Sequence, residues 1–235
     1  MLTLDITAAL GKTITPSMGI PDQEVTAMRT SMKRNVESFI QERKEGDHAW
    51  TMDIYDTHAL NRVKLIAQRL KKEKIQTVVW IGIGGSGLGP KVLQEAFQGP
   101  DTISFFVIDT IDPALLSDYL MLIDWNHAAI VVVSKSGETL ETMSAFFLFY
   151  EALKKARNSR AHERVIAITD PKNGDLHAFA ADNGIDILPV PPLVGGRFSI
   201  FTPVGLLALA LLGKDVDNFL SGAKEMDERC QQTMM

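Results

Sequence analysis

Three segments of this chain combine glycine, hydroxyl and cationic residues in the way that anion-binding loops do. The first is the glycine-rich run 82–90, where residues without a Cβ let backbone N–H groups approach a negative charge. The second is the run 134–142, which offers serine and threonine hydroxyls and the ammonium of Lys135. The third is the run 195–199, in which two glycines precede Arg197. These glycines, with Phe198 and Ile200 after Arg197, predict that Arg197 is buried at a pocket. These residue types predict a site for a phosphate dianion.

The run 134–142 also has a simpler interpretation as a helix cap. Serine and threonine are favoured at helix N-caps, so Ser134, Ser136 and Thr139 fit that role as well. Two such runs, each after a predicted strand and each before a predicted helix, favour ligand binding over capping alone.

The glycine-rich run matches a dinucleotide-binding pattern too. Gly82, Gly84 and Gly87 satisfy G-x-G-x-x-G after a predicted strand. Asp109 follows the next predicted strand, at nearly the distance of a ribose-binding acid. A dinucleotide site requires neither the run 134–142 nor the glycine pair before Arg197, so a nucleotide-dependent oxidoreductase is the less favoured alternative.

The elements that must position these residues alternate between strands and helices. Apolar runs predict strands at 77–81, 104–108, 129–133 and 165–169, with a weaker one at 186–190. Strands that are apolar throughout and alternate with helices indicate a parallel sheet covered on both faces. The predicted fold is a three-layer α/β/α sandwich with a central parallel sheet of about five strands, and its ligands bind beyond the carboxyl ends of the strands.

Helical spacing fills the intervals between these strands. One helix is expected to begin near Pro90, because proline suits a first helical turn. The pattern is clearest over 139–157. The residues predicted to face inward there are Leu140, Met143, Phe146, Phe147, Tyr150 and Leu153.

Amphipathic helices precede and follow the predicted sheet. Apolar spacing predicts helices over 21–45, 57–74 and 216–230, with Met226 among the inward residues of the last. We expect residues 1–75 to form a helical lead-in that packs on a main domain at 76–213. Residues 214–235 are expected to be a C-terminal helix at a point of truncation.

Composition and charge set further expectations. The chain is 46% hydrophobic and 23% charged, as in folded globular proteins. Its net charge of −5 argues against nucleic acid as a partner. A single cysteine, no basic and apolar leader, and no apolar run of about 20 residues predict a cytoplasmic protein without a membrane segment.

The same three runs resemble the phosphoglucose isomerase family and, more broadly, sugar isomerase (SIS) domains. The run 82–90 is similar to the family's GIGGSxLGP, and the run 134–142 is similar to its SKxxxTxET. The run 195–199 is similar to VGGR(F/Y)S. The resemblance extends over about 77–212, and it implies the SIS fold described above.

The resemblance also implies an activity, namely interconversion of glucose 6-phosphate and fructose 6-phosphate without a metal or an organic cofactor, in glycolysis and gluconeogenesis. The implied catalytic residue is Arg197, whose guanidinium would stabilise the enediolate while a proton moves between C1 and C2. A homodimer is implied as well. The implied substrate-binding and phosphate-binding residues are Gly85, Ser86, Ser134, Lys135, Ser136, Thr139 and Glu141.

The chain departs from the family beyond the Arg197 run. In the resembling enzymes a carboxylate base, a histidine and a lysine come from the second half of the chain, whereas this chain ends soon after Arg197. Glu138 and Glu141 belong to the phosphate run and would be poor bases for a distant proton. The histidines that match no family catalytic position are His48, His58, His127, His162 and His177.

We therefore expect the chain alone to bind a sugar phosphate and to turn it over poorly. A fragment lacking a C-terminal half, a split enzyme and a pseudoenzyme all fit this expectation. A non-catalytic phosphosugar-binding module is the alternative function.

Overall fold

The computed structural model describes residues 3, 5–100 and 102–232, without the side chain of residue 232. The chain divides into two compact units. One comprises residues 1–47 with 226–235, and the other comprises residues 48–225. No helix among the described residues is long and apolar enough to cross a membrane.

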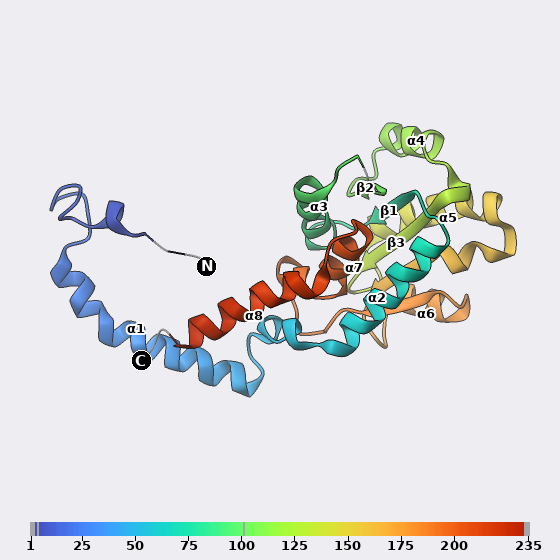
Figure 1. Cartoon of the computed structure of the whole chain (residues 1–235). Coiled ribbons are helices and arrows are strands. Elements are labelled where there is room, and N and C mark those ends of the chain that lie inside the picture. Colours follow the sequence, from blue (N-terminus) through green and yellow to red (C-terminus); the bar gives the residue numbers. More distant parts are fainter. Residues whose placement is uncertain (1–2, 4, 101, 233–235) are drawn as a thin grey trace. The chain divides into compact units, whose positions relative to one another are not determined.

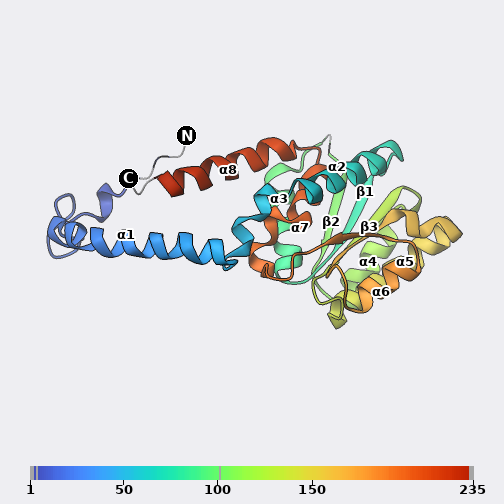
Figure 2. The ribbon, with the colours of Figure 1, turned by 90° about the horizontal axis from the view of Figure 1, so that it is seen from below.

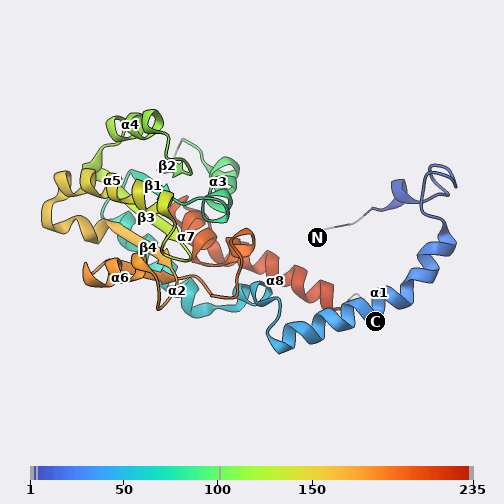
Figure 3. The ribbon, with the colours of Figure 1, turned by 180° about the vertical axis from the view of Figure 1, so that it is seen from behind.

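The larger unit contains a five-stranded sheet in which every neighbouring pair of strands is parallel (Figure 1). The strand order is β2-β1-β3-β4-β5, and Figure 3 shows β4 beside β3. The strands are β1 (Thr77–Ile81), β2 (Ser104–Ile108), β3 (Ala128–Ser134), β4 (Val165–Thr169) and β5 (Asp186–Pro189). The predicted parallel sheet is confirmed.

Helices cover both faces of the sheet (Figure 2). Side chains alternate along β1, so that Val78 and Trp80 join one core cluster while Val79 and Ile81 join the other. One helical layer holds α2 (Thr57–Lys72), α3 (Gly85–Phe97), α7 (Pro203–Leu211) and the start of α8 (Val216–Gln232). The other layer holds α4 (Pro113–Leu122), α5 (Leu140–Arg157) and α6 (Asp175–Asp182). This confirms the three-layer α/β/α fold and explains why the strands are apolar throughout.

Short 3₁₀ helices complete the chain. They are η1 (Thr7–Ala9), η2 (Ala49–Thr51), η3 (Asp53–Tyr55), η4 (Trp125–His127), η5 (Asn158–Arg164) and η6 (Gly196–Phe201). The region 46–55, for which no helix was predicted, contains two of them.

The start of α3 differs from the prediction. The helix begins at Gly85, so Pro90 lies inside it rather than in its first turn. Proline has no N–H, and the Ser86 carbonyl four residues earlier therefore lacks its helical donor. The indole Nε1 of Trp80 donates to that oxygen at 3.0 Å instead. A buried strand residue thus replaces the missing bond.

The buried face of α5 is also displaced from the predicted one. Leu140 and Phe147 are exposed at 76% and 42%, whereas Thr142, Ala145 and Phe149 are buried. The apolar stripe contained more residues than one helix face can bury, so those at its edge are left in solvent. Met226 of α8, predicted to face inward, is 42% exposed.

The smaller unit is built on α1 (Asp22–Glu45), which ends at Gly46 in the left-handed conformation. Arg43 of α1 forms a bidentate pair with Asp227, with nitrogen–oxygen distances of 2.6 and 2.9 Å. Helix α2, predicted as part of a lead-in over 1–75, belongs to the larger unit and shares a core cluster with the sheet. The packing predicted for 21–45 on the main domain stays a prediction.

Candidate functional site

The three predicted runs meet at one edge of the sheet. Strands β1 and β3 are direct neighbours in parallel register, with Ile81 opposite Val132, so the turns after them leave the same carboxyl edge. The chain passes from β1 outward to β2 and from β3 in the other direction to β4. This reversal is a topological switch point, where open α/β sheets bind their ligands.

The turn after β1 is shaped by close backbone approaches. A Cβ on Gly87 would lie 2.2 Å from the carbonyl oxygen of Gly82, and Gly84 has a positive φ of 60°. A Cβ on Gly85 would lie 2.2 Å from the carbonyl carbon of Gly196. Only glycine at position 85 lets the β1 turn and η6 pack backbone against backbone.

The turn after β3 is held by its own hydroxyls. Ser134 Oγ accepts from the Gly137 N–H at 3.1 Å and donates to Thr139 Oγ1 at 3.1 Å. Ser136 Oγ accepts from the Glu138 N–H at 3.2 Å. Thr139 is the N-cap residue of α5, yet its side chain accepts no capping bond. The capping interpretation of Thr139 is therefore wrong.

The hydroxyl hydrogens of this turn differ in availability. Ser134 is 2% exposed, and its hydroxyl is used as the donor to Thr139. Within the described part of the chain, the Ser136 and Thr139 hydroxyls accept hydrogen bonds but donate none. The buried Ser134 hydroxyl therefore stabilises the turn through its own hydrogen bonds, while the hydroxyls of Ser136 and Thr139 retain donors for a ligand.

Lys135 links the β3 turn to the third run. Its half-buried side chain donates from Nζ to the carbonyl oxygen of Val194 at 3.0 Å. Val194 directly precedes the glycine pair, so Lys135 supports the segment that carries Arg197. The ammonium places a positive charge between two of the three runs.

Arg197 is exposed, although its neighbours predicted burial at a pocket. Its backbone is held from both sides instead. Gly196 lies against Gly85, and the ring of Phe198 stacks on Trp50 with centroids 5.1 Å apart and an interplanar angle of 20°. The Trp50 contact could not be anticipated, because η2 lies far from the run 195–199 in sequence.

The remaining predicted residues line the same edge. Ser86 is half-buried at the start of α3, and its carbonyl faces Trp80. Glu141 lies exposed in the first turn of α5. Asp109, the ribose-binding candidate of the dinucleotide interpretation, pairs with Lys91 at 3.3 Å.

Three of the histidines, His127, His162 and His177, contact groups outside the three runs. His127 Nδ1 is 2.8 Å from an Asp124 carboxylate oxygen, and His162 Nδ1 is 3.0 Å from the Ser159 carbonyl oxygen. His177 contacts the backbone of the turn after β4. These placements agree with a structural rather than a catalytic interpretation.

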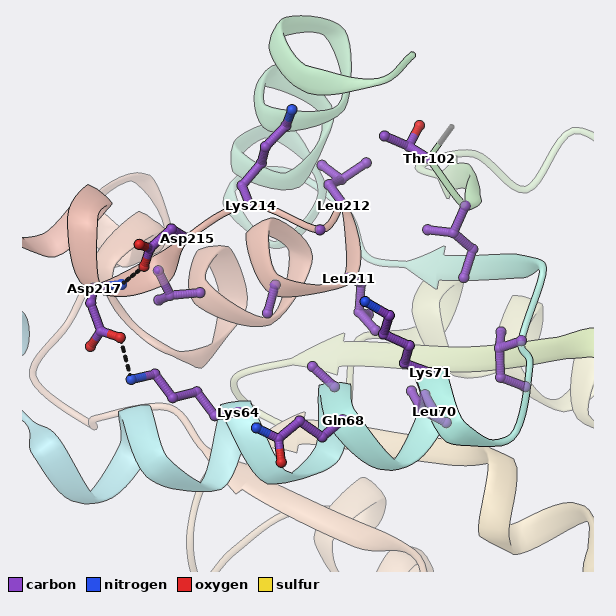
Figure 4. A pocket seen from close by; sticks show the side chains of 16 residues that line it. Lys64, Gln68, Leu70, Lys71, Thr102, Leu211, Leu212, Lys214, Asp215 and Asp217 are labelled. Carbon is purple, nitrogen blue, oxygen red and sulfur yellow. Dashed lines mark hydrogen bonds and ion pairs between the residues drawn. The ribbon is translucent and has the colours of Figure 1, made fainter. Parts of the chain in front are cut away.

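A cavity lies at the opposite edge of the sheet (Figure 4). Its volume is about 570 Å³, and it is lined by α2, α7, the start of α8 and the residues before β1 and β2. Lys64 and Asp217 pair across it at 2.5 Å. It lies at the amino ends of the strands, so it is separate from the switch-point turns. Its lining residues come from segments that are distant in sequence, and no sequence motif predicted the cavity.

Fold and turns together define a class. An open parallel sheet whose switch-point turns present glycine backbone, hydroxyls and a lysine is an α/β protein equipped for a small anionic ligand. The phosphoglucose isomerase family model matches residues 64–235. The chain belongs to the phosphoglucose isomerase family.

Individual relatives agree with this assignment. The glucose-6-phosphate isomerase of Carboxydothermus hydrogenoformans is 40% identical over 174 residues, which cover 68% of this chain and 37% of that protein. A hypothetical protein from Thermus thermophilus superposes with a TM-score of 0.80 at 33% identity, covering 88% of this chain and 50% of the other. A glucose-6-phosphate isomerase from Chlamydia trachomatis gives a TM-score of 0.62 at 27% identity, with coverages of 79% and 38%. The chain thus spans well under half the length of these two glucose-6-phosphate isomerases.

Proposed function

We propose that this chain is the phosphosugar-binding part of a glucose-6-phosphate isomerase, the enzyme that interconverts glucose 6-phosphate and fructose 6-phosphate. The observation that carries the proposal is the meeting of three runs at one edge. The turns after β1 and β3 leave neighbouring strands, and the segment of Arg197 touches the first through Gly196 and the second through Val194.

The β3 turn would hold the 6-phosphate. Ser136 and Thr139 supply hydroxyl donors, and Lys135 supplies positive charge for a dianion. Ser134 fixes the turn through its bonds to Gly137 and Thr139. Glu141, in the first turn of α5, would act as a supporting carboxylate beside this group.

The β1 turn and η6 would face the sugar. Gly85 and Ser86 line this side, and Arg197 extends into solvent beside them. A guanidinium is permanently charged, so it stabilises the negative charge that develops on an enediolate oxygen during proton transfer. The closeness of Gly85 and Gly196 supports a shared role for the two segments.

We further propose that residues 1–235 alone bind the sugar phosphate without turning it over at an appreciable rate. The resemblance assigns the base and the ring-opening groups to a part of the family's chain beyond the Arg197 run. In this state the chain acts as a phosphosugar-binding module. Action in the cytoplasm, in glycolysis and gluconeogenesis, and assembly as a homodimer are inferred from the same resemblance.

Titration calorimetry and thermal melting with fructose 6-phosphate test the binding proposal. A ligand that binds only the folded state raises the melting temperature, so fructose 6-phosphate should stabilise the chain and NAD should not. The double variant Ser136→Ala with Thr139→Ala should lose this effect. Ser144→Ala is the matched control, since it removes an exposed hydroxyl from α5 away from the turn. Stabilisation by NAD alone would refute the proposal.

A further inference from the structure

The turn between β4 and α6 lies against the turn after β3, which is called the phosphate turn below (residues 134–139). It is not part of any of the three predicted runs. It spans residues 170–174, and the Asp170 carboxylate closes it. One carboxylate oxygen accepts from the backbone N–H groups of Lys172 and Asn173, each at 2.8 Å. These bonds, the Lys172 N–H first, lower the pKa of Asp170. His177 Nδ1 lies 3.1 Å from the Asp170 carbonyl oxygen and fixes the same turn to α6.

Two backbone hydrogen bonds reach the phosphate turn, one from this turn and one from the start of α6. The Asp170 N–H donates to the Lys135 carbonyl at 3.1 Å, and the Leu176 N–H donates to the Gly137 carbonyl at 3.0 Å. The two accepting carbonyls lie on either side of Ser136. The phosphate turn is therefore held at both of its flanks from the same side.

Gly174 packs closely against the phosphate turn. A Cβ on Gly174 would lie 2.2 Å from the Ser136 carbonyl oxygen and 3.1 Å from Gly137 Cα. Its backbone angles, φ 93° and ψ 154°, belong to a region that only glycine adopts readily. Both the space and the conformation at position 174 therefore require glycine.

The contacts share one consequence for electrostatics. The carbonyl oxygens of Lys135, Ser136 and Gly137 all approach the turn 170–174 or the start of α6. A carbonyl oxygen repels a phosphate oxygen, whereas N–H and O–H groups attract it. Holding three successive carbonyls against a neighbouring turn keeps them away from an anion in the phosphate turn.

We propose that the turn 170–174 positions the phosphate turn, and that Gly174 is its positioning residue. This turn bonds the Lys135 carbonyl and packs against the Ser136 carbonyl, and α6 directly after it bonds the Gly137 carbonyl. The donors of the phosphate turn are thereby left facing a phosphosugar. The inference rests on the proposed function, because it assigns the phosphate of that ligand to the turn after β3.

The test compares Gly174→Ala with Gly213→Ala in the full chain. Gly213 also has a positive φ, 75°, but a Cβ there meets nothing within 4 Å, so it reports backbone strain alone. Melting temperatures should fall for both variants. Only Gly174→Ala should weaken binding of fructose 6-phosphate, by about 10-fold or more, the scale of one lost hydrogen bond to a charged group.

Inorganic phosphate separates positioning from general destabilisation. Its affinity should fall by the same factor as that of fructose 6-phosphate in folded Gly174→Ala, because both ligands use the phosphate turn. Unchanged affinities in folded Gly174→Ala, or an equal loss in Gly213→Ala, would overturn the inference. If wild-type chain binds neither ligand, the proposed function fails first.

A second pair of variants decides the matter should Gly174→Ala not fold. Asp170→Ala removes the acceptor that closes the exposed turn, and it should weaken binding of both ligands by about 3-fold, as expected for an ordinary hydrogen bond. Asp170→Asn keeps an oxygen for the N–H groups of Lys172 and Asn173, so it should restore most of the affinity. Equal affinities for Asp170→Ala and wild type would contradict the positioning role.

Discussion

The turns after β1 and β3 reach the same edge of the sheet but are built by different means. The β1 turn depends on missing side chains, because Gly85 and Gly87 bring backbone within contact of other backbone. The β3 turn depends on side chains that are present, because Ser134 and Ser136 accept hydrogen bonds from its own N–H groups. One turn is shaped by space and the other by polar bonds.

The difference teaches how each turn should respond to substitution. Adding one methyl group at Gly85 or Gly87 forces backbone to move, since the nearest atoms there are backbone atoms. Removing one hydroxyl from the β3 turn leaves its backbone braced by the turn 170–174. Additions should therefore damage the first turn most, and deletions should change the second in smaller steps.

The largest effect is expected from Gly85→Ala. The new Cβ would lie 2.2 Å from the Gly196 carbonyl carbon, so the segment of Arg197 must shift. We expect the affinity for fructose 6-phosphate, measured by calorimetry, to fall by about 100-fold, which corresponds to about 3 kcal/mol of lost binding free energy. Gly89→Ala is the control, because a Cβ there meets nothing within 4 Å and alanine suits a helix interior. Equal affinities of Gly85→Ala and wild type would break the comparison.

A smaller effect is expected from Thr139→Ala. The variant removes a hydroxyl that retains its donor for the ligand, and a hydrogen bond to a charged group corresponds to about 10-fold or more in affinity. Thr139→Ser keeps the hydroxyl and should recover the affinity measured by calorimetry. An affinity of Thr139→Ala equal to that of Thr139→Ser and wild type would show that the hydroxyl plays no part in binding.

Trp80→Phe tests a side chain that supports the β1 turn. The variant removes the indole donor to the Ser86 carbonyl, which Pro90 has already deprived of a helical partner. A partly buried acceptor without a partner costs about 1–3 kcal/mol in the free energy of unfolding, measurable by urea denaturation. Affinity for fructose 6-phosphate should change less than in Gly85→Ala. The reverse order would mean that the turn is held by this bond rather than by backbone contact.

The smallest effect is expected outside both turns, at Asp53 of η3. Burial, and then the charge of Asp56, raise the pKa of Asp53 to about 6. Its Oδ2 is buried and has no hydrogen-bond partner among the residues that the structure describes. In the unfolded chain the pKa of this group lies near its ordinary value of 3.8. The stability of the folded chain should therefore fall as pH rises from about 4 to 6 and stay lower above that range.

Asp53→Asn should remove this penalty. Two pKa units correspond to about 3 kcal/mol, and partial exposure reduces the expected gain to about 1 kcal/mol at pH 7.5. Below the unfolded pKa the variant and wild type should unfold alike in urea, and affinity for fructose 6-phosphate should be unchanged throughout. An equal gain at low pH would show that packing rather than charge is responsible.

The strands of the sheet could be predicted from the sequence because a buried strand is a continuous run of apolar residues. The bounds predicted for β2 and β4 match the structure, since both strands are short apolar runs between polar residues. The predictions for the beginning of α3 and the inner face of α5 were wrong. A glycine-rich segment allows more than one helix start, and a wide apolar stripe allows more than one buried face.

The residue types also indicated which runs form the candidate site, but they did not indicate how these runs contact one another. Residue types alone indicated anion-binding turns after β1 and β3. The contacts of Gly85 with Gly196 and of Trp50 with Phe198 join segments more than 100 positions apart, and no local pattern encodes them. The exposure of Arg197 was missed for the same reason, because it depends on what packs around η6.

The bond from Lys135 to the Val194 carbonyl has a consequence for how a bound substrate is sensed. The same ammonium belongs to the turn assigned to the phosphate and supports the stretch of backbone leading to Arg197. If the proposed phosphosugar draws Lys135 toward itself, that support would loosen, and the two ends of the ligand would be coupled through one cation. Such coupling is reciprocal: if binding at the phosphate end changes the affinity at the sugar end by some factor, binding at the sugar end changes the affinity at the phosphate end by the same factor.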